Sequence, residues 1–201
     1  MIAIIDFGIS NIGSVYNALN FLNIKSKIVS KTSELKKLKK FIIPGSGKFG
    51  EGMHLLKEKG FVENLNELVL VKKRPILGIC LGYHLMLKSS EESKNVKGLG
   101  WINGKAVKFS SKKKLPIPHV GWNKINFKKI KILKNIPNNS MFYFDHSYYP
   151  KINDKKFLFC KTKYANKFYS IYEKENIFAC QPHPEKSQKY GLELLKNFYK
   201  I

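Results

Sequence analysis

The sequence predicts an α/β fold in which a parallel or mixed central sheet is flanked by helices. Three short apolar runs are each followed by a glycine-containing turn and then by residues at helical spacing. That alternation is typical of a parallel sheet covered on both faces. The second half instead contains strand candidates joined by short polar turns. A chain of 201 residues with 43% hydrophobic content is long enough for one sizeable core, so we expect a single domain over residues 1–201.

The first strand and helix occupy the amino-terminal segment. Met1 to Ile5 is an apolar run that ends in Asp6-Phe7-Gly8, which indicates a buried strand feeding a tight turn. Ser10 or Asn11 can then cap a helix, because their side-chain oxygens accept hydrogen bonds from free backbone amides. Apolar residues at helical spacing follow at Ile12, Val15, Tyr16, Leu19 and Leu22.

Two further strands end in turns that can carry chemistry. Phe41 to Ile43 is interrupted at once by Pro44 to Gly47, and Pro75 to Ile79 runs directly into Cys80. A helical stripe then begins at Leu81. Because ligands of open α/β sheets bind outside the carboxyl ends of the strands, we expect the functional site at these turns.

The second half predicts a mixed or antiparallel extension of the same sheet. The last segment, Tyr190 to Tyr199, places three apolar side chains on one helical face, so we expect it to pack back on the core. The strand candidates are Lys105 to Phe109, Met141 to Phe144, Lys156 to Cys160, Phe168 to Tyr172 and Ile177 to Cys180.

Composition argues against nucleic acid and against a membrane. The formal net charge is +23, but of 37 basic residues only Arg74 is arginine, the residue best suited to bidentate phosphate and base contacts. No stretch approaches the roughly 18 uncharged apolar residues of a membrane span. We therefore expect a cytoplasmic protein with solvated lysine faces. Its three cysteines are widely spaced and show no zinc or redox pairing.

Cys80 lies between glycines at the junction of a buried strand and a helix. This arrangement is typical of a nucleophile elbow, in which small neighbours permit a strained turn that exposes the side chain. Backbone donors at the helix start favour the thiolate, and the amide of Leu81 offers an oxyanion site. The alternative interpretation is a buried structural cysteine, the commonest state of this residue.

A base and an orienting carboxylate follow the last strand candidate. The segment Gln181-Pro182-His183-Pro184-Glu185 holds an imidazole and a carboxylate between two prolines, which stiffen the backbone. A lone histidine is more often a surface or core residue. Paired with a cysteine elbow, His183 and Glu185 complete the cysteine–imidazole–carboxylate set of a nucleophilic hydrolase.

These motifs resemble class I glutamine amidotransferases. GICLG at residues 78–82 and HPEKS at residues 183–187 carry the resemblance, and PGSG at residues 44–47 is similar to the family's oxyanion strand. PHVGWN at residues 118–123 and the segment Phe142 to Tyr149 resemble in particular the glutaminase subunit of imidazole glycerol phosphate synthases. The resemblance covers nearly the whole chain and implies a class I glutamine amidotransferase-like fold.

The resemblance implies glutamine hydrolysis by a Cys80–His183–Glu185 triad, with no cofactor and no metal. Cys80 would attack the side-chain amide of L-glutamine, His183 would pass a proton to the leaving ammonia, and Glu185 would hold the imidazole. Ammonia would pass through a tunnel to a barrel-shaped synthase subunit in a heterodimer. The residues implied to lie near glutamine or its oxyanion are Gly45, Ser46, Gly47, Leu81, Gly82, His84, His146, Ser147 and Tyr148.

Three positions depart from the family pattern. His84 stands where glutamine is usual, Ser46 where valine is usual, and Pro182 where phenylalanine is usual. An imidazole at residue 84 would alter the affinity for glutamine or its pH dependence. Gly121, Trp122 and Asn123 lie toward the subunit interface in this interpretation, although a Trp122 packed in the core is equally consistent with the sequence.

Several functional alternatives fit the same motifs. A paralogous glutaminase subunit could supply ammonia for amidination of a bacterial surface sugar, since the partner sets the acceptor. A non-enzymatic binding or regulatory homologue would keep the fold and use its lysines to hold an anionic partner. A cysteine peptidase or deglycase on a similar sheet is disfavoured, because those folds place their histidine in other contexts.

Overall fold

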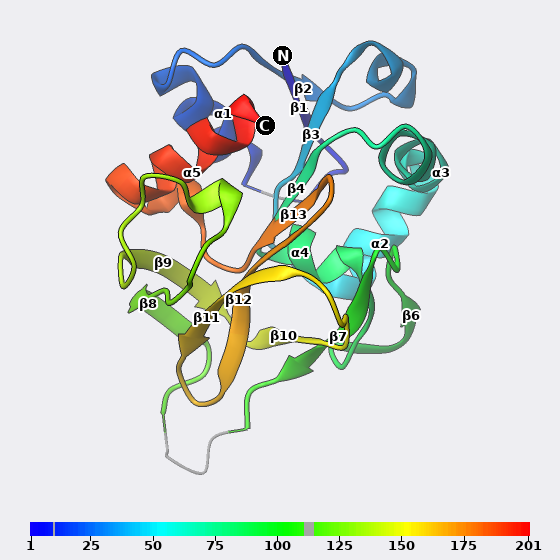
Figure 1. Cartoon of the computed structure of the whole chain (residues 1–201). Helices are drawn as coiled ribbons and strands as arrows, with labels where there is room; N and C mark the ends of the chain where they lie inside the picture. Colours follow the sequence, from blue (N-terminus) through cyan, green and yellow to red (C-terminus); the bar gives the residue numbers. More distant parts are fainter. Residues whose placement is uncertain (10, 111–114) are drawn as a thin grey trace.

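The computed structural model describes residues 1–9, 11–110 and 115–201 (Figure 1). Strands and helices alternate in the first half, whereas strands dominate the second. In chain order the elements are β1 (Ile2–Ile5), α1 (Ile12–Phe21), β2 (Ser26–Val29), β3 (Lys40–Ile43), α2 (Phe49–Glu58), α3 (Phe61–Asn66), β4 (Ile76–Ile79), α4 (Leu81–Met86), β5 (Leu87–Ser90), β6 (Ser93–Lys97), β7 (Ile102–Lys108), β8 (His119–Lys124), β9 (Met141–His146), β10 (Tyr148–Ile152), β11 (Leu158–Lys163), β12 (Lys167–Lys174), β13 (Ile177–Cys180), the 3₁₀ turn η4 (Pro184–Lys186) and α5 (Gln188–Lys200).

The main sheet has seven strands in the order β11-β12-β13-β4-β3-β1-β2. Its central strands pair in parallel, with β4 between β3 and β13, while β11 and β12 add an antiparallel edge. The three predicted parallel strands and the antiparallel extension by residues 156–172 are thus confirmed. The carboxyl ends of β3, β4 and β13 meet side by side, which gathers the Pro44–Gly47 turn, Cys80 and the His183 segment at one place.

The predicted membership of two strands in this sheet is wrong. Residues of β7 belong to a separate four-stranded sheet, β10-β7-β5-β6, and β9 pairs with β8 in a two-stranded sheet. Alternating apolar residues indicate a half-buried strand but do not specify its partner, because pairing depends on contacts between distant segments. In Figure 1 these smaller sheets lie in the lower half of the molecule, with β8 and β9 on the left and β7 and β6 on the right.

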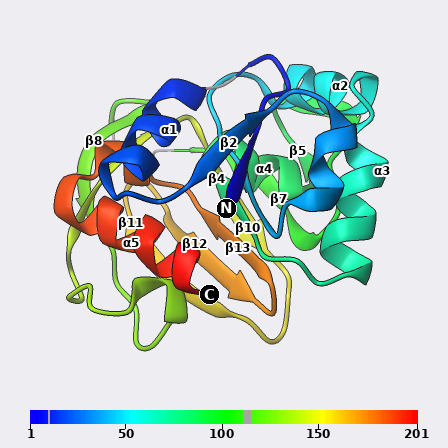
Figure 2. The same cartoon turned by 90° about the horizontal axis from the view of Figure 1, so that it is seen from above.

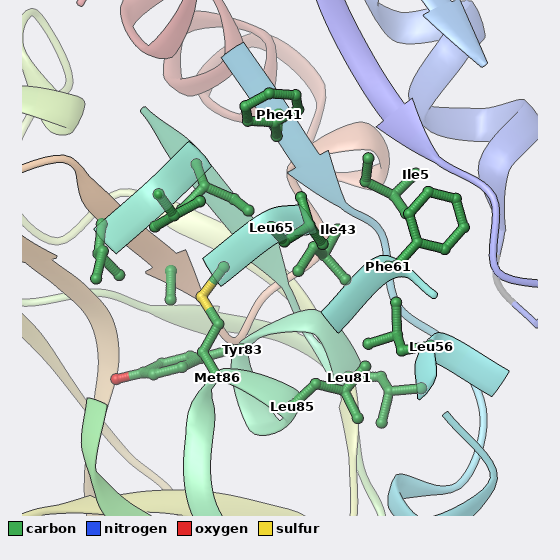
Figure 3. Close-up of a cluster of buried hydrophobic side chains, with 14 of the residues drawn as sticks. Ile5, Phe41, Ile43, Leu56, Phe61, Leu65, Leu81, Tyr83, Leu85 and Met86 are labelled. Carbon is green, nitrogen blue, oxygen red and sulfur yellow. The ribbon is translucent and has the colours of Figure 1, made fainter. Parts of the chain in front are cut away.

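Helices cover both faces of the main sheet. Viewed from above, α1 and α5 lie on one side, and α2 and α3 lie on the other (Figure 2). Side chains alternate along the central strands, so that Ile2 and Ile4 of β1 face one cluster and Ala3 and Ile5 face the other. Figure 3 shows part of the cluster between the sheet and helices α2 to α4, which includes Phe41 of β3 and Leu81 of α4. The two buried clusters make the sheet a rigid base for its terminal turns.

The helix starts differ in detail from the sequence prediction. Asn11 occupies the N-cap position of α1 but its side chain caps no backbone amide; instead its Oδ1 accepts a hydrogen bond from Ser14 Oγ at 2.9 Å. The other predicted cap, Ser10, lies outside the described residues. The carboxyl-terminal helix is present as α5 and buries Leu195 and Phe198 as predicted. Among the helices described here, none is long and apolar enough to cross a membrane.

Candidate functional site

Cys80 sits on a strained turn between β4 and α4. Its φ of +50° and ψ of −103° lie outside the regions that L-residues favour. Two hydrogen bonds hold this conformation: the Cys80 amide donates to Cys180 O at 2.8 Å, and the His84 amide donates to Cys80 O at 3.2 Å. Backbone strain of this kind persists where surrounding structure enforces it. The nucleophile-elbow geometry expected from the sequence is therefore present.

Glycines let the neighbouring backbones close around the elbow. A Cβ atom on Gly45 would overlap the Ile79 carbonyl oxygen and the amide nitrogens of Leu81 and Gly82. A Cβ atom on Gly82 would likewise overlap the carbonyl oxygen of Ile43. The turn after β3 thus lies directly against the start of α4. Gly45 to Gly47 and Leu81 line the same cavity as Cys80, so their backbone amides are candidates for an oxyanion site.

His183 and Glu185 form a buried pair next to this turn. His183 Nδ1 and Glu185 Oε1 are 2.7 Å apart, and the two side chains are 5% and 2% exposed. The backbone around them is held on both sides, because the His183 amide donates to Tyr143 O at 2.9 Å and Ser187 Oγ donates to His183 O at 2.6 Å. The pair is thus oriented by β9 and by the turn that leads into α5.

The electrostatics of the pair favour a protonated imidazole. Burial by itself lowers the pKa of His183, but the Cys80 thiolate and the Glu185 carboxylate outweigh it and raise the pKa to about 10. The Glu185 carboxylate also hydrogen bonds to the ring. Since a charged partner stabilises the charged form, His183 is an imidazolium at neutral pH and can act as a proton donor.

Cys80 and His183 open onto a cavity of about 550 Å³. Of the residues expected near glutamine, all but Gly82 line it, and Gly82 instead packs behind the elbow against Ile43. Five other lining residues did not figure among the expected site residues. The full lining is Asn11, Gly45, Ser46, Gly47, Cys80, Leu81, His84, Glu92, Pro118, Asp145, His146, Ser147, Tyr148, His183 and Lys186.

Glu92 is the most informative of these additional residues. It lies in the turn between β5 and β6, and its Oε2 accepts a hydrogen bond from the Phe49 amide at 2.7 Å. Carboxylates are scarce in this chain, with 14 acidic against 37 basic residues, so the adjacent pair Glu91-Glu92 was a usable signal. Because Glu92 is distant in sequence from every motif, the sequence did not predict that it lines the cavity.

The other histidines of the site are neutral. Burial lowers the pKa of His84 to about 4, against a smaller raising effect of its hydrogen bond to Gln181. Burial also lowers the pKa of His146 well below its usual value and that of His119 to about 4. His119 Nδ1 lies 3.0 Å from His146 Nε2. The imidazole at residue 84 therefore adds no charge where the family carries an amide.

Trp122 is a surface residue. Its side chain is 43% exposed and lies in β8 beside Val120, which is 55% exposed. The core placement left open by the sequence is wrong. An exposed apolar pair next to the cavity's β8–β9 wall is a common feature of protein interfaces.

Replacing Glu185 by Gln is expected to move the alkaline limit of activity. The carboxylate raises the pKa of His183, so Glu185→Gln lowers it, and the imidazole loses its proton at a lower pH. The alkaline limb of kcat/KM should shift down by about one unit or more. A pH profile of Cys80-dependent turnover measures this. Glu193→Gln, the same change on the surface of α5, should leave the limb in place; an equal shift in both variants would contradict the assignment.

Comparison with known proteins agrees with this geometry. Residues 3–201 match the family model described as glutamine amidotransferase class-I. The chain is 47% identical over 201 residues to imidazole glycerol phosphate synthase subunit HisH 2 of Methanococcus maripaludis, covering 100% of this chain and 99% of the relative. It is 45% identical to subunit HisH 1 of Campylobacter jejuni, with 100% of each chain covered. Subunit HisH 2 of Pseudomonas aeruginosa is 40% identical, again with 100% of each covered.

Solved structures share the fold at lower identity. PurLQS from Thermotoga maritima superposes with a TM-score of 0.78 at 17% identity and covers 99% of this chain and 97% of its own. The glutaminase domain of CTPS from Trypanosoma brucei gives a TM-score of 0.69 at 15% identity, covering 99% and 93%. At these identities the likeness concerns the fold alone, and it confirms the α/β class predicted from the sequence.

Proposed function

Because this chain belongs to the class I glutamine amidotransferase family, we propose that it is the glutamine-hydrolysing subunit of an imidazole glycerol phosphate synthase and releases ammonia for a partner subunit. One observation carries the proposal: a cysteine on a strained elbow opens onto the same cavity as an imidazole that a buried carboxylate holds at 2.7 Å. Identities of 40–47% to synthase subunits over the full length support the choice of enzyme.

In the proposed reaction Cys80 Sγ attacks the amide carbon of the glutamine side chain. We propose that the resulting oxyanion is stabilised by backbone amides of Leu81 and of the Gly45–Gly47 turn, which lies against the start of α4. His183 gives its proton to the departing nitrogen, which leaves as ammonia and a thioester remains. The now neutral His183 takes a proton from water, which attacks the thioester and releases glutamate. Glu185 keeps Nδ1 of the ring engaged in both steps.

The remaining cavity residues are proposed to recognise the amino-acid end of glutamine. Glu92 supplies a carboxylate for the α-ammonium group, and its hydrogen bond to the Phe49 amide fixes its position. Ser147 and Tyr148 line another part of the cavity at the junction of β9 and β10, where we place the α-carboxylate. A carboxylate at one place and neutral donors at another suit the two charges of a zwitterionic substrate.

The proposed partner is a barrel-type synthase subunit that docks over the β8–β9 face. Val120, Trp122 and Met141 are exposed there, at 55%, 43% and 38%, and Pro118 before β8 lines the cavity. A partner seated on this patch would lie close to Cys80 and could receive ammonia without loss to solvent. We place the complex in the cytoplasm, because its nucleophile is a free thiol that a reducing compartment preserves.

Complementation tests the acceptor. Expressed with its cognate synthase partner, the chain should restore growth without histidine to a bacterial strain lacking both proteins, and the Cys80→Ala variant should not. Glutamate release by the purified chain should be weak and should rise when the synthase partner is added together with its acceptor. Failure to complement, together with partner-stimulated glutamate release, would contradict the histidine assignment and favour the surface-sugar acceptor. Absence of glutamate release under every condition would favour a non-enzymatic homologue.

A further inference from the structure

We propose that Gln181 is a positioning residue for the nucleophile, donating a hydrogen bond from its side-chain amide to the Cys80 sulfur while His84 holds the amide in place. The inference rests on the proposed function and adds one buried contact to it. Gln181 Nε2 lies 3.6 Å from Cys80 Sγ, and Gln181 Oε1 lies 2.7 Å from His84 Nε2. The three residues therefore form a chain from the α4 imidazole to the reacting sulfur.

The fold places Gln181 beside the elbow with little freedom. It follows β13, whose last residue, Cys180, accepts the hydrogen bond of the Cys80 amide at 2.8 Å. The backbone N–H of Gln181 donates a hydrogen bond to Ser170 O of β12 at 2.8 Å, so the backbone of Gln181 is held from the other side. His84 is four residues beyond Cys80, on the same turn of α4. Gln181 spans the two ends of that turn from the neighbouring strand.

Burial makes the two contacts necessary. Gln181 is 0% exposed, and His84 and Cys80 are 6% and 8% exposed, so water cannot readily satisfy the amide. A buried amide without hydrogen-bond partners is strongly unfavourable or forces a rearrangement. Among the described residues, the hydrogen-bond partners of its side chain are His84 and Cys80. With its oxygen bound to His84, the side-chain amide of Gln181 directs its NH₂ group at the Cys80 sulfur.

The direction of the hydrogen bonds follows from the charges. A thiolate needs a donor, which the NH₂ group supplies, and the carbonyl oxygen then requires a donor from the ring. His84 must therefore be the Nε2–H tautomer. The reverse orientation would aim the amide oxygen at the sulfur and would repel a thiolate. A neutral His84 fits this role, whereas a positively charged ring would also donate but is disfavoured by burial.

Other ionisable groups surround the same sulfur. His183 faces it from the segment after β13, and from β9 the carbonyl oxygen of Asp145 accepts a hydrogen bond from the Cys80 thiol at 3.7 Å. Cys180 is close enough for its thiol to sense Cys80. The His183 imidazolium supplies the main opposite charge, so Gln181 is expected to tune the thiolate and not to create it. A donor to the charged form favours that form.

Alkylation of Cys80 tests the contact without glutamine or a partner. In Gln181→Leu, of similar size and without the donor, the pH midpoint of iodoacetamide alkylation at Cys80 should rise by about one unit, followed by mass spectrometry. The kcat for glutamate release in the complex should fall about tenfold with KM changed less than about twofold. His84→Phe should shift the midpoint in the same direction, because the side-chain amide of Gln181 loses its hydrogen bond to residue 84. His84→Gln, which keeps a donor at that position, should have the wild-type midpoint.

A matched control separates this contact from general loosening of the core. Ser170 is also 0% exposed and donates to another buried sulfur, Cys160 Sγ, at 3.4 Å. Ser170→Ala should leave the Cys80 midpoint unchanged. Wild-type midpoints in folded Gln181→Leu and His84→Phe would overturn the inference, and if Gln181→Leu does not fold, His84→Phe decides it. Missing glutaminase activity in the wild type would instead count against the proposed function, since alkylation needs no substrate.

Discussion

Cys80→Ala is expected to reduce glutamate release at least about a thousandfold, because the thioester route requires the sulfur. Binding of glutamine should survive, since the cavity lining contributes its other contacts. Turnover is measured by glutamate production in the complex with the synthase partner, at saturating glutamine. Residual turnover within tenfold of the wild type would rule out Cys80 as the nucleophile.

The other two cysteines provide the control. Cys160 and Cys180 are both 0% exposed; burial raises the pKa of Cys160 to about 12 and that of Cys180 well above its usual value. A chloroketone analogue of glutamine should therefore form one adduct, at Cys80, as judged by peptide mass spectrometry. Cys160→Ala should keep turnover. Adducts on Cys160 or Cys180 at a comparable rate would contradict this account.

Gly45→Ala is expected to lower kcat by about a hundredfold or more, although residue 45 carries no reacting group. The new methyl group would overlap backbone atoms of Ile79, Leu81 and Gly82. Unlike a side chain, the backbone cannot relieve such an overlap by changing rotamer. The Pro44–Gly47 turn must move away from the elbow, which removes oxyanion donors worth about a hundredfold each. Overpacking of this kind also destabilises a fold by about 1–3 kcal/mol.

The test compares turnover with the reactivity of the thiol. In Gly45→Ala, iodoacetamide should still alkylate Cys80, because the thiol and His183 remain, while glutamate release falls. Gly13→Ala is the matched control: a methyl group at Gly13 in α1 meets nothing within 4 Å, and it should stabilise the helix by about 0.5–1 kcal/mol without changing turnover. Equal turnover in the two variants would show that the turn after β3 does not build the oxyanion site.

The chemistry of the site was readable from the sequence because its signals are local. The glycines around Cys80 indicate a tight turn in which larger neighbouring residues would not fit. The structure contains that turn, with a φ of +50° at Cys80. The two prolines around His183 likewise act on their own segment. The three parallel apolar strands are short, continuous and almost wholly buried, so their composition alone distinguished them.

What the sequence did not reveal depends on contacts between distant segments. Strand β2 begins with Ser26 and Lys27, and its half-exposed edge position leaves no continuous apolar run to detect. The Gln181 amide lay within a recognised motif, yet its role appears only when β13 places it between His84 and Cys80.

The sequence by itself predicted the candidate catalytic set and determined the parallel core, because steric limits and side-chain chemistry act within a few residues. The tertiary structure decided which groups surround that set. Glu92 reaches the cavity from the β5–β6 turn, and β7 and β9 leave the main sheet for separate ones. Strand pairing and cavity lining are chosen by packing across the whole chain, and an alternating pattern records that a strand is half buried without naming its neighbour.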